Sequence, residues 1–157
     1  MDDAARSLAR GLLAKARTAA LGTLDPVTGA PVVTRIGLSQ TPEGQPLTLI
    51  SDLSGHTRAL DGDARCSILV GPPALRGDPL TAARLTLQCL ARSCQPDSRA
   101  YAALCRRYLS RNSKAALYID FADFRLVELR VTSAFLNAGF GRAHQLDPAD
   151  LGLPPLD

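Results

Sequence analysis

Residues 47–60 read LTLISDLSGHTRAL, and this stretch decides how the fold is interpreted. Leu47–Ile50 is a short apolar run typical of a strand, and it leads directly into hydroxyl, imidazole and guanidinium side chains. Such a junction suits an anion, because hydroxyls donate hydrogen bonds and a guanidinium pairs with phosphate oxygens. A helix that begins near Ser54 adds free backbone N–H groups directed the same way. Without a glycine-rich phosphate motif, the stretch alone fits better a strand, an N-cap serine and a surface helix.

Turn signals separate this strand from its neighbours. Asp25–Gly29 and Thr41–Gly44 combine proline, glycine and small polar residues, which favour turns. The apolar or β-branched runs around these turns are expected to pair as an antiparallel meander: Thr18–Leu24, Pro31–Leu38 and Leu47–Ile50. Further strands are expected at Cys66–Val70, Arg84–Ser93 and Phe124–Leu136.

Two amphipathic helices are expected beside the strands. The first lies within residues 1–17, from Asp3 to Arg17, and the second opens at Pro96-Asp97 and ends near Asn112. Residues 145–157 are expected to form a C-terminal tail. The sequence therefore predicts one mainly β (α+β) domain over residues 1–157, a six-stranded antiparallel β-barrel with flanking helices.

Composition and charge exclude several classes of protein. With 157 residues and 46% hydrophobic content, the chain can bury one core, and its net charge of +3 is too small and scattered for nucleic acid. No apolar run suits a signal peptide or a membrane span, so we expect a cytoplasmic protein with no membrane partner. The four cysteines lack C-x-x-C spacing and nearby histidines, which favours core thiols over a zinc site or a redox dithiol.

Several segments together resemble one known family. They are Ser51-Asp52-Leu53 with His56-Thr57, Gly77-Asp78-Pro79-Leu80 leading into Arg84–Gln88, and Leu136–Ala143. From roughly Arg17 to Ala143, the chain resembles the pyridoxamine 5′-phosphate oxidase-like split-barrel flavoproteins, in particular the branch associated with heme utilisation. The resemblance implies a six-stranded split barrel that forms a homodimer and binds FMN, a small-molecule ligand, in two clefts at the interface.

The resemblance also implies which residues hold the flavin. The implied cofactor-binding residues are Arg35, Ser51, His56, Thr57, Arg58 and Arg84. Arg35 stands where the family's arginine reaches the phosphate, Ser51 where a strand-end threonine contacts the flavin, and Arg84 where a polar residue borders the ring. His56 and Thr57 replace an Arg-Lys pair that grips the phosphate, and Arg58 is positioned to compensate in part.

Three functions remain open at the level of sequence. The chain has no tryptophan and no Arg-Leu-His-Asp-Arg-like segment, so oxidation of pyridoxamine phosphate is not expected. An FMN-dependent oxidoreductase is the first expectation; the flavin supplies that chemistry, and no catalytic acid–base residues are assigned. The alternative is a heme-binding or heme-degrading protein with His144 as iron ligand, tuned by an acidic partner such as Asp120 or Asp123. The third is a non-catalytic binding module.

Overall fold

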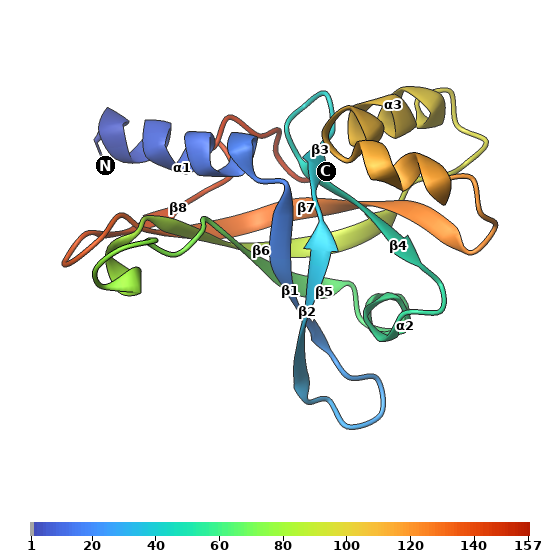
Figure 1. The fold of residues 1–157 in the computed structure, drawn as a ribbon, viewed down its shortest axis with the longest axis horizontal. Coiled ribbons are helices and arrows are strands. Elements are labelled where there is room, and N and C mark those ends of the chain that lie inside the picture. The colour runs from blue at the N-terminus through green and yellow to red at the C-terminus, as the bar shows by residue number, and fades with distance from the viewer. Residues whose placement is uncertain (1) are drawn as a thin grey trace.

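The computed structural model describes residues 2–157 as a strongly curled antiparallel sheet with helices packed against it (Figure 1). The helices are α1 (Asp3–Lys15), α2 (Gly55–Gly62) and α3 (Tyr101–Arg111), with short 3-10 turns η1 (Pro79–Thr81) and η2 (Ser113–Leu117). The strands are β1 (Thr18–Leu24), β2 (Pro31–Gly37), β3 (Ser39–Gln40), β4 (Pro46–Ser51), β5 (Arg65–Val70), β6 (Arg84–Ser93), β7 (Phe124–Asn137) and β8 (Ala143–Leu146). This is the predicted split half-barrel, with two short strands more than expected.

The order of the strands corrects the expected meander. The sheet runs β2-β1-β5-β6-β7-β4-β3, with β8 added beside β7, so β4 pairs with β7 and not with β2. The reason is visible in β4 itself, where five consecutive residues from Pro46 to Ile50 are buried. A strand buried on both faces needs cover on both sides, and β4 finds it between the barrel core and α3.

The main core lies between the concave face of the sheet and α1. Ala5, Ala9 and Leu13 follow helical spacing and are buried against strand residues such as Leu87 and Leu136. The helix begins as expected, because the Asp2 carboxylate accepts a hydrogen bond from the Ala5 amide at 2.6 Å. It ends at Lys15, two residues before the expected end, because the chain becomes extended at Ala16.

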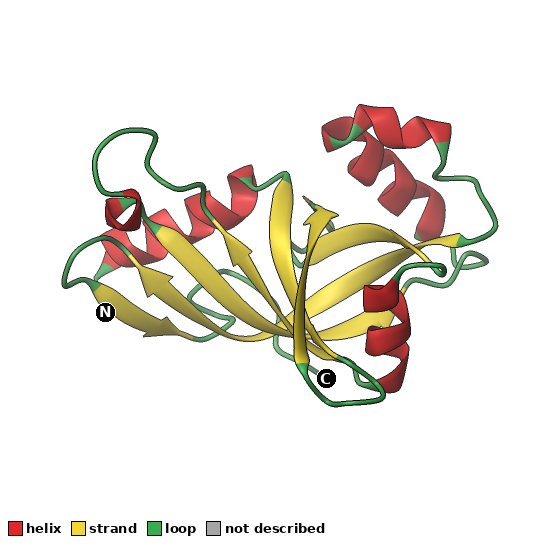
Figure 2. Ribbon diagram, turned by 60° about the horizontal axis from the view of Figure 1, so that its bottom comes forward, coloured by secondary structure: helices red, strands yellow, loops and turns green. Residues whose placement is uncertain are grey.

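A second, smaller core lies on the other face of β4 and β7. There α3 and η2 cover Leu47, Leu49 and Leu126, and Figure 2 shows these helices at the opposite end of the sheet from α1. Tyr108 of α3 is buried over the end of β2, where a Cβ at Gly37 would collide with its hydroxyl group. The glycine therefore lets α3 approach the sheet closely. α3 begins at Tyr101, after a turn, and not at Pro96-Asp97.

The C-terminal residues are more ordered than the expected tail. Ala143–Leu146 form β8, in which His144 is paired with Leu136, and the following segment docks against α1. The Arg6 guanidinium donates to the Asp150 carboxylate at 2.8 Å, and Leu151 and Leu153 join the main core. None of the helices in residues 2–157 is both long and apolar enough to cross a membrane.

Candidate functional site

The strand register separates the predicted cofactor residues into two groups. Ser51 lies opposite Phe124 at the start of β7, whereas Arg84 lies opposite Asn137 at its end. The 14 residues of β7 rise about 3.3 Å each, so the two ends lie roughly 40 Å apart. One chain therefore brings Ser51 close to its α2 neighbours but not close to Arg84.

The residues at the start of α2 bond mainly to one another. The Ser51 hydroxyl donates to the Asp123 carboxylate at 2.7 Å, and the Thr57 hydroxyl donates to the Ser51 carbonyl at 2.6 Å. The Arg58 guanidinium turns back to the Leu53 carbonyl at 3.0 Å. These three predicted ligands thus stabilise the turn between β4 and α2, and Thr57 is only 1% exposed.

His56 lines a cavity of about 360 Å³ between α2 and the β1–β2 hairpin. Its Nδ1 lies 3.0 Å from the Thr34 hydroxyl, and burial lowers the pKa of the imidazole. The imidazole is therefore neutral at pH 7 and offers no fixed positive charge. Asp25 lines the same cavity, and hydrogen bonds from the Thr28 and Val27 amides lower the pKa of this carboxyl group. An ionised carboxylate in the cavity disfavours a second anion.

A second guanidinium beside the turn is that of Arg125, which sequence reasoning missed. Its Nη2 donates to Asp61 at 2.7 Å, and its Nε lies 2.9 Å from Asp52 as an ion pair with poor hydrogen-bond geometry. Two carboxylates therefore already neutralise this cation, and Asp123 adds a third negative charge beside Ser51. The turn is a poor fit for the phosphate group of FMN, because three carboxylates lie around it and its own exposed cation, Arg58, is directed at the Leu53 carbonyl oxygen.

Arg35 is placed differently from the other candidates, on the outer face of the sheet. The register aligns Arg35, Ala20, Leu69, Thr86 and Phe135 in one row across β2, β1, β5, β6 and β7. Arg35 is exposed, and within residues 2–157 its side chain makes neither a hydrogen bond nor an ion pair. It is therefore a cation available to a ligand or partner on this face.

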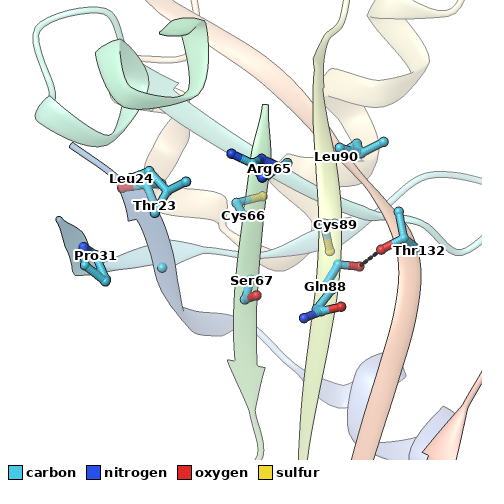
Figure 3. A pocket seen from close by; sticks show the side chains of 11 residues that line it. Thr23, Leu24, Pro31, Arg65, Cys66, Ser67, Gln88, Cys89, Leu90 and Thr132 are labelled. Carbon is cyan, nitrogen blue, oxygen red and sulfur yellow. Dashed lines mark hydrogen bonds between the residues drawn. The ribbon is translucent and has the colours of Figure 1, made fainter. Parts of the chain in front are cut away.

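A groove crosses the outer face beside this row (Figure 3). Gly22, Ser67, Gln88 and Ser133 align in the next row, and the missing side chain of Gly22 leaves a hollow there. The cavity measures about 540 Å³, within the usual range for small-molecule sites. We call it the outer groove; its lining residues are Gly22, Thr23, Leu24, Pro31, Arg65, Cys66, Ser67, Gln88, Cys89, Leu90 and Thr132.

Exposed apolar side chains surround the outer groove. Val33 is 70% exposed, Phe135 43%, and Leu69 and Leu90 41% each, and all four lie on the outer face of the sheet. Apolar residues gathered on one face of a soluble protein mark a binding surface. The sequence did not reveal this surface, because its members come from four strands whose register only the structure gives.

His144 and Arg84 lie near each other along the sheet but on opposite faces. His144 is paired with Leu136, whose side chain is in the core, whereas Arg84 is paired with Asn137. His144 is half-exposed, and its imidazole has no hydrogen-bond partner in the described part of the chain. Asp120 and Asp123 precede β7 and so lie at the other end of that strand, far from His144.

Arg84 is engaged locally, and no metal cluster is evident. Its guanidinium donates to the Leu80 carbonyl at 3.0 Å, which stabilises the loop before β6. Over residues 2–157, no group of three or more His, Cys, Asp or Glu side chains is placed to hold a metal ion.

A curled half-barrel with an open, partly apolar groove defines a class of small-ligand-binding split-barrel proteins. The model of the pyridoxamine 5′-phosphate oxidase family matches residues 6–138, so the chain belongs to this family. A search of curated proteins finds no match.

Solved structures of relatives agree with this assignment. A heme binding protein from Mycobacterium smegmatis is 30% identical over 94% of this chain, with a TM-score of 0.85. A protein of unknown function from Agrobacterium tumefaciens is 38% identical over 94% of the chain, with a TM-score of 0.81. This chain spans 60% of the length of each. The heme storage protein HutZ from Vibrio cholerae, 22% identical over 78% of this chain and 86% of its own, shares the fold with a TM-score of 0.62.

Proposed function

We propose that this protein binds heme in the outer groove, in a cleft that a second copy of the chain completes. The observation that carries the proposal is the contrast between the two candidate sites. The turn at α2 has its hydroxyls engaged and carries three carboxylates, whereas the outer groove has an apolar wall and lies beside the row that contains the unpaired cation of Arg35. A flat apolar ring with peripheral carboxylates suits the second site and not the first.

The dimer follows from the same surface. An apolar face formed by Val33, Leu69, Leu90 and Phe135 is stabilised when a partner covers it. Two-fold pairing also explains how residues at opposite ends of β7 contribute to one site. In an isologous dimer, the start of β7 in one copy can lie beside the end of β7 in the other.

Within such a cleft, the roles of the residues are binding and orientation. Arg35 pairs with a carboxylate of the ligand and the groove floor at Gly22 accepts the ring. His144 lies on the opposite face of the sheet in its own copy, so in this cleft the imidazole for the iron comes from the second copy. Heme, when bound, supplies the redox or oxygen chemistry. No acid–base group of this chain is needed for that step, so a purely heme-carrying protein fits equally well.

FMN is the second candidate, favoured by one observation. Arg35 is a free cation on the strand position that the family resemblance assigns to the flavin phosphate. A bound flavin would supply hydride or electron chemistry. The acidic turn at α2 weakens the phosphate grip, so we expect weaker binding of FMN than of heme.

Titration of the full-length protein with hemin and with FMN tests the proposal. We expect a Soret band with hemin at low micromolar concentrations, and little change in the flavin band near 450 nm at equal FMN. Gly22→Val fills the outer groove, since a Cβ there meets only the Ser67 carbonyl oxygen at 3.7 Å. It should weaken hemin binding at least about tenfold, or 1.4 kcal/mol.

Control variants separate ligand binding from folding. Gly11→Ala introduces a Cβ into open space on α1 and should leave hemin binding unchanged. His144→Ala should shift or remove the Soret band if the imidazole binds iron. Tight FMN binding with no hemin band would replace heme by flavin, and binding of neither would leave a non-catalytic module.

A further inference from the structure

Two cysteines that are far apart in the sequence face each other across neighbouring strands. Cys66 of β5 is paired directly with Cys89 of β6, and Figure 3 shows the two residues on these neighbouring strands. The Ala91 amide donates to the Ala64 carbonyl at 2.8 Å, which makes Ala64 and Ala91 a hydrogen-bonded pair. Hydrogen-bonded and non-hydrogen-bonded pairs alternate along antiparallel strands, so Cys66 and Cys89, two residues further on, are also a hydrogen-bonded pair. Such pairs hold their Cα atoms about 5.5 Å apart, within the range that disulfides span.

The two thiols differ in environment. Cys66 is 8% exposed and Cys89 3%, and the backbone around both forms part of the outer groove. Hydrogen bonding from Cys89 lowers the pKa of Cys66, and the same contact raises the pKa of Cys89 well above its ordinary value. Both side chains belong to the main core, and Cys66 is the thiol that ionises first and the more exposed of the two.

We propose that Cys66 and Cys89 are a redox-active dithiol that peroxides convert into a cross-strand disulfide. The Cys66 thiolate attacks the peroxide, its O–O bond breaks, and Cys66 sulfenic acid forms while the alcohol or water leaves. Cys89 sulfur then attacks the Cys66 sulfur, the S–S bond forms, the S–O bond breaks, and water leaves with the Cys89 proton. In total, one peroxide is reduced and two thiols are oxidised.

The geometry also predicts that this bond is easily reduced. Cβ atoms of directly opposed residues lie about 4.5–5.5 Å apart, the larger value for hydrogen-bonded pairs, whereas a disulfide holds them near 3.8 Å. Strands β5 and β6 must therefore move closer to each other at this pair. The irregularity of the β6–β7 register between Gln88 and Cys89 allows β6 to shift locally. A strained disulfide has a more oxidising potential and returns to the dithiol with mild reductants.

Closure also changes the outer groove. Ser67 and Gln88, which form its floor, are the next residues to Cys66 and Cys89 on their strands. Movement of the two backbones therefore alters the shape that a ligand meets, and hemin affinity should differ between oxidised and reduced protein. This last point rests on the proposed function; the disulfide itself does not.

Peptide mapping of the full-length protein tests the proposal. The protein is treated with hydrogen peroxide in native buffer, blocked with iodoacetamide under denaturing conditions, digested and analysed by mass spectrometry. We expect a linked peptide pair joining Cys66 to Cys89, with a loss of about 2 Da that mild dithiothreitol reverses. In Cys89→Ala, a sulfenic acid on Cys66 should instead be trapped by dimedone.

The other two cysteines provide the internal control. Burial raises the pKa of Cys94 and of Cys105. Both should therefore stay reduced at the peroxide concentration that links Cys66 to Cys89, and should be recovered as alkylated peptides. The proposal is overturned if Cys66 and Cys89 stay reduced while Cys94 or Cys105 is oxidised. It is also overturned if the linked pair appears only when urea is present during oxidation.

Discussion

The Thr57 hydroxyl donates to the Ser51 carbonyl at 2.6 Å, and this bond explains one departure from the family pattern. The family resemblance predicts a cation at position 57, but this side chain is 1% exposed in the core. A lysine there would have to take its ammonium group into the core, which is unfavourable. Threonine fits because its short side chain satisfies its polar atom within the turn.

His56 gives a prediction about pH at the same scale. Burial lowers the pKa of His56 below its ordinary value of 6.5, so the unfolded chain binds this proton more readily than the folded one. The folded state is therefore fully stable with respect to His56 above pH 6.5, and loses stability as the pH falls below it. Urea unfolding at pH 7.5 and 5.5 measures this loss.

The matched variants are His56→Gln and His144→Gln. His56→Gln should lose less stability than the wild type between pH 7.5 and 5.5. His144→Gln leaves His56 in place and should lose as much stability as the wild type. An unchanged pH dependence in His56→Gln would show that other groups cause the loss.

At the level of elements, the contact between β2 and α3 is close-packed, because Tyr108 lies directly over Gly37. Tyr108 is 3% exposed, and burial raises the pKa of its hydroxyl group to about 12. Gly37→Ala places a methyl group against this hydroxyl and should destabilise the protein by about 1–3 kcal/mol, as overpacking of cores does. Denaturant unfolding of the single variant checks the magnitude.

A second substitution tests the cause of that loss. Tyr108→Phe removes the hydroxyl and keeps the ring. Gly37→Ala should therefore lower the free energy of unfolding clearly less in the Tyr108→Phe protein than in the wild type. A double-mutant cycle with zero coupling would show that contacts other than the one with the hydroxyl make Gly37 necessary.

The elements also show what the sequence could predict. Alternating and apolar runs located six strands within one or two residues of their ends, because burial on a sheet face imposes that pattern. β8 was missed, since its four residues, AHQL, are too few and only half apolar, and they pair only with β7. The outer groove and the pairing of Cys66 with Cys89 could not be predicted, because both depend on the register between strands distant in sequence.

For the whole molecule, the uncovered outer face gives a prediction about assembly. Phe135 lies in the middle of this face and is 43% exposed. Phe135→Asp places a charge where the second copy should pack, and should convert the expected dimer into a monomer in light-scattering measurements. Val27→Asp, at a turn residue that is 91% exposed, is the control and should remain dimeric.

Two results would contradict a dimer formed through the outer face. A wild-type protein that is monomeric at high micromolar concentration would exclude a cleft shared between copies. A Phe135→Asp variant that remains dimeric would place the interface on a different face.

The length of β7 sets a limit on how this molecule can evolve. The strand joins the α2 end of the barrel to the β8 end as one element with a bulge at Thr132, so its length sets the separation of two regions that the proposed dimer would bring together. Deleting or inserting one residue that no such bulge absorbs would exchange the two faces of β7 beyond that point. Natural variants of this strand should therefore either gain or lose a bulge or change length in steps of two, and each step of two would move Arg84 and His144 relative to the turn at α2.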